Sequence, residues 1–300
     1  MAFETRATIA SFGGTLLKLT HQSTTTGTPM NLNLYLPPAV AKQQQQEGAP
    51  AQPGKKVPVL IWLSGLTCTP DNATEKAFFQ HAASRHGIAI AYPDTSPRGL
   101  DLPGERDSWD FGEAASFYLD ARRPPFDRNY RMETYLTDEL PGVLFAPGAF
   151  GDRLDRGRVS IAGHSMGGHG ALTLYLRHPG LYRSVSAFAP IANPVSCPWG
   201  QKAFAGYLGE EDRAAWAEHD ATELVRGWKG GPLNALVDVG TGDNFYKQGQ
   251  LLPENFEAAV KEAGLDGLTL RYQEGYDHSY FFMASFSDDH IAHAAKFLGA

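Results

Sequence analysis

Near the middle of the chain, residues 159–170 read VSIAGHSMGGHG. The segment sets Gly163, Ser165 and Gly167 in the spacing G-x-S-x-G, after a β-rich run and before a helical pattern. This context is typical of a nucleophile elbow, a turn so tight that Cβ atoms on either side of the serine would clash. The N-terminus of the following helix would favour negative charge that develops at the serine. G-x-S-x-G by itself is a weak signal, because glycine and serine are common, but this context favours a catalytic serine over a chance match.

Continuous apolar and β-branched runs recur along the chain, as is typical of strands buried on both faces of a parallel sheet. They span residues 57–63, 87–92, 158–162, 184–189 and 233–239, with a weaker sixth at 268–273. Helical patterns separate them, at 73–85, 130–145, 167–177, 253–262 and 279–297. This alternation predicts a doubly wound, mostly parallel α/β sheet with helices on both faces. No linker interrupts the alternation, so we expect one domain over residues 1–300.

Two shorter strands, at 15–20 and 30–36, precede this pattern and predict a hairpin. After them comes the low-complexity segment 39–56, which contains a run of glutamines and cannot form a packed face. We expect this segment to be a surface insertion between two strands.

The composition excludes several classes of protein. Of the 300 residues, 42% are hydrophobic and 20% are charged, which is too apolar for a disordered chain. The net charge of −7, with no basic patch, argues against a nucleic-acid partner and against an anionic membrane surface. Two cysteines cannot form a disulfide scaffold and no signal peptide is visible, so we expect a cytoplasmic protein. No nucleotide-binding glycine motif and no H-E-x-x-H motif occurs, so we expect neither a cofactor nor a metal.

An activated serine needs an orienting acid and a base, which in this kind of sheet follow the serine in that order along the chain. Asp243 comes after the strand expected at 233–239, through a glycine-rich turn that ends at the carboxyl edge of the sheet. His278 lies in the turn between the last strand and the last helix, at the same edge. We therefore predict that Asp243 and His278 are the partners of Ser165.

Other residues fit these two roles less well. Three aspartates are disfavoured because they lie inside a strand, at the wrong end of one, or directly beside the histidine: Asp238, Asp266 and Asp277. His219 lies in an acidic helical segment, and we expect it at the surface. His290 and His293 are three residues apart on the last helix; they could hold a metal, but a solvated helix face is the commoner arrangement.

An oxyanion hole needs two backbone N–H groups. Met166, directly after the serine, would supply one of them. The other would come from the loop 64–69 after the first buried run, where Gly65 lets the backbone bend toward the site and Leu66 is the expected donor. The alternative is an ordinary connection between a strand and a helix, which the elbow disfavours.

Several long blocks resemble the S-formylglutathione hydrolase family, also called esterase D, over nearly the whole chain. They read SGLTCT at 64–69, PDTSPRG at 93–99, DSWDFG at 107–112, GHSMGGHGAL at 163–172, AFAPIANP at 187–194, CPWGQKAF at 197–204 and QEGYDHSY at 273–280. The resemblance implies the α/β-hydrolase fold and a cytosolic serine hydrolase that cleaves S-formylglutathione to glutathione and formate in formaldehyde detoxification. The catalytic triad of the family falls on Ser165, Asp243 and His278. The family is usually dimeric, so we expect a homodimer. Segment 39–56 departs from the family, because it is longer than the usual turn, and we expect this difference to affect the contacts of the dimer more than the chemistry.

The resemblance also bears on two segments whose roles spacing leaves open. Residues Ser108–Gly112 and Cys197–Phe204 read as loops rich in Trp and Phe, equally compatible with surface anchors and with pocket walls. The resemblance favours walls around the acyl and thiol portions of the substrate, with Trp199 as one wall residue.

Three further side chains are candidates for substrate contact or regulation. Arg98 and Lys202 could bind the carboxylates of glutathione, although a solvated surface charge is the commoner role for such residues. Cys68 lies two residues after the expected oxyanion donor, and the resemblance implies a thiol near the active serine that is open to modification.

Two other functions remain open at this point. A general carboxylesterase that acts on small acetyl esters would use the same triad. A non-catalytic binding protein on this fold would normally have lost a triad residue, which disfavours it here.

Overall fold

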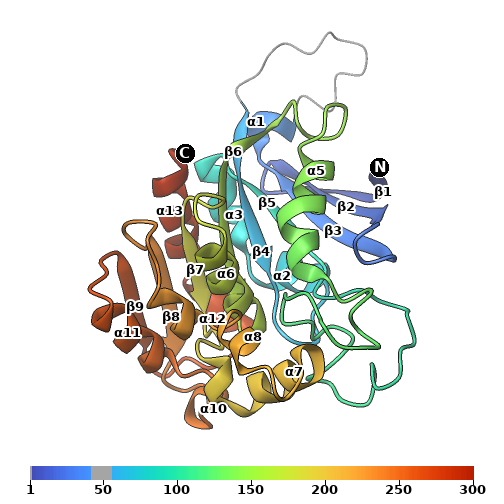
Figure 1. Ribbon diagram of the computed structural model, residues 1–300. Coiled ribbons are helices and arrows are strands. Elements are labelled where there is room, and N and C mark those ends of the chain that lie inside the picture. Colours follow the sequence, from blue (N-terminus) through green and yellow to red (C-terminus); the bar gives the residue numbers. More distant parts are fainter. Residues whose placement is uncertain (1, 42–55) are drawn as a thin grey trace.

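Residues 2–41 and 56–300 are described by the computed structural model, and within them nine strands form one sheet (Figure 1). The strands lie across the sheet in the order β1-β2-β3-β5-β4-β6-β7-β8-β9. Their bounds are β1 Glu4–Ser11, β2 Gly14–Gln22, β3 Pro29–Leu36, β4 Val57–Leu63, β5 Ala89–Pro93, β6 Leu154–His164, β7 Val185–Phe188, β8 Ala235–Gly240 and β9 Leu268–Gln273. The pairs β1–β2, β2–β3 and β3–β5 are antiparallel, and every later pair is parallel. The expected hairpin and the mostly parallel sheet are both confirmed.

Helices cover both faces of this sheet. Helix α6 packs on β4, β6 and β7, whereas α13 packs on α3 and also contacts β6 and β7. Figure 1 shows α6 in front of the sheet, with α3 and α13 behind it. The helices are α1 Pro38–Ala41, α2 Pro70–Lys76, α3 Phe79–His86, α4 Met132–Thr134, α5 Leu140–Leu144, α6 Met166–Arg177, α7 Pro198–Leu208, α8 Arg213–Ala217, α9 Ala221–Val225, α10 Asn244–Lys247, α11 Pro253–Glu262, α12 Tyr280–Ser285 and α13 Ser287–Leu298, with a π-helical segment η2 Tyr135–Glu139 and a 3₁₀ turn η3 Pro194–Ser196.

Two expected helices are broken in the structure. The pattern at 73–85 belongs to two helices, α2 and α3, because Phe78 between them adopts a left-handed backbone with φ +58°. The pattern at 279–297 likewise forms α12 and α13, which meet at Phe286. Apolar periodicity reports which face of a segment is buried, and it does not reveal a break of one or two residues.

The loop expected at 197–204 is wrong, because this segment forms most of helix α7. Cys197 caps the helix, and its Sγ accepts the Gly200 N–H at 3.5 Å. The proline that follows Cys197 occupies the first helical position, where no N–H is needed. Two glycines obscured a helical spacing of buried residues at Trp199, Ala203, Phe204, Tyr207 and Leu208.

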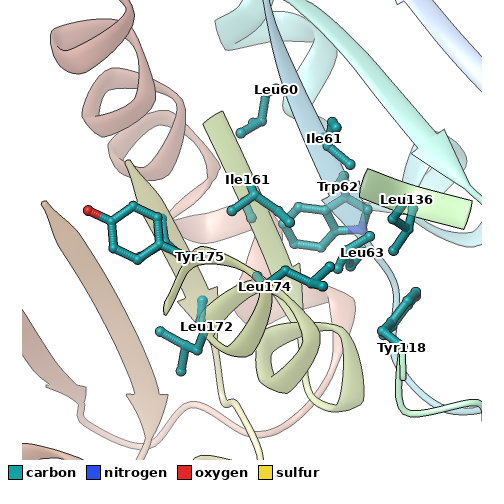
Figure 2. Close-up of a cluster of buried hydrophobic side chains, with 14 of the residues drawn as sticks. Leu60, Ile61, Trp62, Leu63, Tyr118, Leu136, Ile161, Leu172, Leu174 and Tyr175 are labelled. Carbon is teal, nitrogen blue, oxygen red and sulfur yellow. The ribbon is translucent and has the colours of Figure 1, made fainter. Parts of the chain in front are cut away.

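Strand β4 lies at the centre of the hydrophobic core. All seven of its residues are buried, as expected for a strand that helices cover on both faces. Figure 2 shows side chains of β4, β6 and α6 in one buried cluster, including Trp62, Ile161 and Leu174. No helix among the described residues is long and apolar enough to cross a membrane. The expected surface insertion at 39–56 falls mainly on residues 42–55, which lie outside the described residues.

Candidate active site

Ser165 lies at the junction of β6 and α6 in a strained backbone conformation, with φ 58° and ψ −120°. Its N–H donates to the Phe188 carbonyl at 2.9 Å, which fixes the turn against β7. A Cβ on Gly163 would lie 2.1 Å from the Gly167 oxygen, and a Cβ on Gly167 would lie 2.0 Å from the Leu63 oxygen. Only glycine fits at both positions, so the turn holds a buried serine at the carboxyl edge of the sheet.

Asp243 and His278 lie on the loops that follow β8 and β9. The Nδ1 atom of His278 is 2.5 Å from Oδ2 of Asp243. Asp243 is fully buried, and its Oδ1 accepts the N–H groups of Phe245 at 2.7 Å and Tyr246 at 3.3 Å. Strands β6, β8 and β9 run in parallel, so the loops after them lie at the same edge of the sheet as Ser165.

The loop after β4 lies directly against the serine. A Cβ on Gly65 would be 3.1 Å from the Ser165 Cβ. The Ser64 carbonyl accepts the Tyr118 hydroxyl at 2.8 Å, which holds the start of this loop. In the part of the chain that the structure describes, the N–H groups of Leu66 and Met166 donate no hydrogen bond to another backbone group. That these two amides form an oxyanion hole stays a prediction.

A row of aromatic side chains leads from the surface to His278. The Phe245 ring meets the His278 ring edge-on, with centroids 4.8 Å apart. Trp199 packs on Phe245 at 4.7 Å, and Trp109 meets Trp199 edge-on at 5.6 Å. Trp199 is 7% exposed and Trp109 is 55% exposed, so the row ends in solvent. Helix α7 thus brings Trp199 close to the base, with Phe245 between them.

These features together fit a known family of enzymes. A family model described as "Putative esterase" matches residues 23–293. An S-formylglutathione hydrolase from Rattus norvegicus is 50% identical over 289 residues, which covers 96% of each chain. The S-formylglutathione hydrolase from Arabidopsis thaliana is 49% identical over 287 residues, which covers 96% of this chain and 95% of that one. The chain belongs to the S-formylglutathione hydrolase family.

The solved structures agree with this assignment. The structure of an S-formylglutathione hydrolase from Agrobacterium tumefaciens matches with a TM-score of 0.87 and 42% sequence identity, and each chain covers 100% of the other. A ferulic acid esterase matches with a TM-score of 0.66 at 19% identity, a likeness of fold alone. The family and the sheet together identify the α/β-hydrolase fold of a serine esterase.

Arg98, a residue inside one of the family blocks, is occupied by protein contacts. Its guanidinium bonds both carboxylate oxygens of Asp94, the nearest at 2.8 Å, and its Nη2 donates to the Cys68 carbonyl at 2.9 Å. Thr95 Oγ1 donates to the same carbonyl at 2.6 Å. Arg98 therefore ties the loop 64–69, the predicted oxyanion loop, to the residue that follows β5, which disfavours direct binding of substrate carboxylates.

Lys202 and Cys68 occupy different surroundings. The Lys202 ammonium donates to Ser108 Oγ at 2.7 Å and pairs with Asp110, so it ties α7 to the Trp109 loop while remaining partly exposed. The Cys68 thiol lies 3.4 Å from the Tyr280 hydroxyl. Burial raises the pKa of this thiol, so at neutral pH it is mainly protonated.

The expected positions of two other histidines are wrong. His219 is 4% exposed rather than at the surface, and burial lowers its pKa to about 3. His290 is buried, and its ring stacks on Phe188 with centroids 3.6 Å apart. His293 Nε2 lies 3.0 Å from the Asn234 carbonyl. His290 thus does not lie on the solvated face of the helix, whereas His293 is partly buried there. Within the described residues no group of three or more His, Cys, Asp or Glu could hold a metal.

Two neighbours of the base were missed by sequence reasoning. Phe245 could have been noticed, because it comes two residues after Asp243 at the start of a short helix. His164 lies beside Ser165 in the elbow motif, but nothing in its spacing indicates that its ring centroid lies 4.4 Å from that of His278. The pair comes together only when the loop after β9 folds over the end of β6.

Proposed function

We propose that this chain hydrolyses S-formylglutathione to glutathione and formate, with Ser165 as nucleophile, His278 as general base and Asp243 as the acid that orients it. The observation that carries the proposal is the 2.5 Å contact between His278 Nδ1 and the buried Asp243 carboxylate, at the sheet edge where Ser165 sits on its elbow. The likeness to S-formylglutathione hydrolases over the full length of the chain supports the substrate.

The acylation step follows from the geometry of the base. Because Nδ1 of His278 is bonded to Asp243, Nε2 is the nitrogen that accepts the Ser165 proton as Oγ attacks the formyl carbon. Negative charge then moves to the carbonyl oxygen, for which the amides of Leu66 and Met166 are the proposed donors. The C–S bond breaks, glutathione leaves with the proton held by His278, and the formyl group remains as an ester on Ser165.

Deacylation uses the same groups in a second cycle. Water attacks the formyl ester and gives one proton to His278. Collapse of the tetrahedral intermediate returns the proton to Ser165 and releases formic acid, which loses its remaining proton to solvent and becomes formate. In both steps the buried Asp243 carboxylate stays ionised. Its negative charge therefore compensates the positive charge on the imidazolium of His278.

The surroundings of the base support a small acyl group. Trp199 and Phe245 form a wall of rings beside His278, and we propose that this wall excludes acyl groups larger than formyl. For the thiol portion we propose contacts at the exposed Trp109 and at Lys202, whose ammonium remains partly exposed next to it. The two carboxylates of glutathione would be attracted to that cation.

A series of glutathione thioesters tests the proposal. We expect kcat/KM to fall steeply from S-formyl- to S-acetyl- to S-lactoylglutathione, because each added group meets the wall. Equal rates along the series would contradict the acyl-size argument and indicate a broad thioesterase. Higher kcat/KM with p-nitrophenyl acetate than with S-formylglutathione would favour a general carboxylesterase, which could use the same triad.

The family resemblance supports a further proposal about the assembly. We propose a cytoplasmic homodimer with neither a nucleic-acid nor a membrane partner; the net charge of −7 supports the last two points. Light scattering after size-exclusion chromatography should give twice the mass of one chain. A mass of one chain at micromolar concentration would contradict the dimer.

A further inference from the structure

His164 lies directly before the proposed nucleophile, yet the chemistry derived above does not use it. It is the last residue of β6, and it is 7% exposed. Within the described residues its buried Nε2 has no hydrogen-bond partner. A buried polar atom without a partner destabilises a folded protein, so an apolar side chain would be the more stable choice here. The packing of the ring, which another flat ring could also supply, is therefore the contact to consider.

The side chain of His164 touches two parts of the proposed catalytic machinery. Its ring centroid lies 4.4 Å from that of His278, with an angle of 46° between the planes. Its Nδ1 lies 3.4 Å from the position that a Cβ on Gly65 would occupy, so the ring also lies against the oxyanion loop. Tyr280 is the other ring near it, with centroids 6.4 Å apart.

Two other contacts of the His278 ring bear on its orientation. Asp243 holds Nδ1, and Phe245 meets the ring edge-on at 4.8 Å. Asp243 orients the imidazole through Nδ1, and the packing of neighbouring rings limits the rotation that remains about the side-chain bonds of His278. Misplacing a catalytic group by 1 Å can lower a rate about a hundredfold.

His164 is also suited to a neighbour that becomes positively charged during the reaction. Burial, together with the nearby His278, holds the pKa of His164 well below its usual range, so its ring is uncharged at neutral pH. The charged groups that face it are His278 itself and, through His278, the Asp243 carboxylate. An uncharged ring supports the imidazolium of His278 without repelling it, which a charged side chain at this position would do.

We propose that His164 is a positioning residue, whose ring fixes the orientation of His278 and supports the oxyanion loop at Gly65. The inference rests on the proposed triad, but it does not depend on the identity of the thioester. It assigns His164 no contact with substrate and no proton transfer.

The test compares His164→Ala with a matched variant, His169→Ala. His169 is also a buried histidine with an unpartnered ring nitrogen within the described residues; it lies in the first turn of α6, and its ring packs on Phe117 and Phe204 instead of His278. Both variants remove one buried imidazole, so we expect both to unfold at lower denaturant concentration. For folded protein we expect kcat to fall at least tenfold in His164→Ala, with KM changed less than twofold, and to stay within threefold of wild type in His169→Ala.

A third variant separates positioning from packing. His164→Phe keeps a flat ring beside His278, and we expect its kcat to be at least fivefold above that of His164→Ala. If the alanine variant does not fold, the phenylalanine variant is compared with wild type instead, and we expect its kcat to lie within tenfold of the wild-type value. Wild-type kcat in folded His164→Ala, an equal fall of kcat in both alanine variants, or no recovery with phenylalanine would overturn the proposal. If His164→Ala does not fold, a folded His164→Phe whose kcat is more than tenfold below wild type would also overturn the proposal.

Two readouts keep this test separate from the proposed substrate. The rate at which a fluorophosphonate labels Ser165 depends on the base and not on glutathione, and we expect it to fall with kcat in His164→Ala. The proton on His278 Nδ1, which a short bond to a carboxylate shifts far downfield in the NMR spectrum, should broaden or move upfield in the same variant. If wild-type protein does not hydrolyse S-formylglutathione, the proposed function fails while these two measurements still test His164.

Discussion

Ser165 is held in a strained turn by contacts that do not involve its hydroxyl group. Ser165→Ala should therefore fold with unchanged stability and lose the reaction, apart from a remainder that binding and the oxyanion amides supply. We expect kcat to fall by at least about a thousandfold, measured with purified protein and S-formylglutathione. Ser160→Ala is a matched control, because it removes another buried hydroxyl on β6, bonded to Ser184 Oγ at 2.8 Å. Retention of about a tenth of wild-type kcat in Ser165→Ala would rule out this serine as nucleophile.

The thiol of Cys68 should be the site of inhibition by a maleimide. It lies in the oxyanion loop and contacts the Tyr280 hydroxyl, so a bulky adduct would displace the loop. Because burial raises its pKa, the thiolate is scarce at neutral pH, and the rate of inhibition should increase as the pH is raised. We expect Cys68→Ser to be active and resistant to N-ethylmaleimide.

The second cysteine provides the control for this experiment. Cys197 is fully buried at the start of α7, and burial raises its pKa to about 11. Cys197→Ser should therefore remain as sensitive to the maleimide as wild type. Inhibition that persists in Cys68→Ser but disappears in Cys197→Ser would show that the maleimide acts at Cys197, and it would contradict the prediction.

At the scale of elements, the close approach of α6 to β4 is what holds the elbow. Gly167→Ala would place a Cβ 2.0 Å from the Leu63 oxygen, an overlap that backbone atoms cannot relieve without moving the helix away from the strand. We expect a loss of several kcal/mol in the free energy of unfolding, roughly the range of severe core substitutions, together with loss of activity. Chemical denaturation monitored by fluorescence would measure the first effect.

Gly142→Ala is the matched control at this scale. Gly142 also lies in a helix, α5, but a Cβ there would meet nothing within 4 Å. Alanine should therefore stabilise the protein by up to about 1 kcal/mol through helix propensity alone. If both variants changed stability by the same small amount, the contact between α6 and β4 would not be as tight as the structure has it.

For the whole molecule, buried histidines predict sensitivity to acid. Burial lowers the pKa of His169 and His293 to about 4 and that of His219 to about 3. In the unfolded chain a histidine titrates near about pH 6.5, so between that pH and about pH 4 the unfolded state binds more protons than the folded state. The free energy of unfolding should consequently fall as the pH is lowered through this window, by up to about 1.4 kcal/mol per pH unit for each such histidine.

Denaturant titrations at a series of pH values would measure this slope. His219→Gln should reduce the slope by about one proton, whatever it does to stability at neutral pH. A free energy of unfolding that does not vary between pH 6.5 and 4 would contradict the neutral, buried state of these histidines.

Much of the architecture followed from local pattern. The buried run at 57–63 coincides with β4, because a strand covered on both faces must be apolar throughout. The weaker run at 268–273 coincides with β9, an edge strand whose residues are only partly buried or exposed. Strand β1, Glu4–Ser11, was not expected, since its residues are mostly exposed and carry no such signal. Helix α7 was misjudged because two glycines lowered its apparent helix propensity, while its buried face has the helical spacing.

The sequence by itself determined the alternation of buried strands and helices from residue 57 onward, apart from α7, together with the elbow around Ser165 and the loops in which Asp243 and His278 were sought. These depend on spacing along the chain and on the rule that loops after parallel strands reach one edge of the sheet. Only the tertiary structure decided which side chains surround the base, such as His164 and Phe245 against His278. It also decided that Arg98 is occupied by Asp94 and that His219 is buried. Such contacts join residues far apart in the sequence, and their geometry depends on how whole elements pack, which no local periodicity encodes.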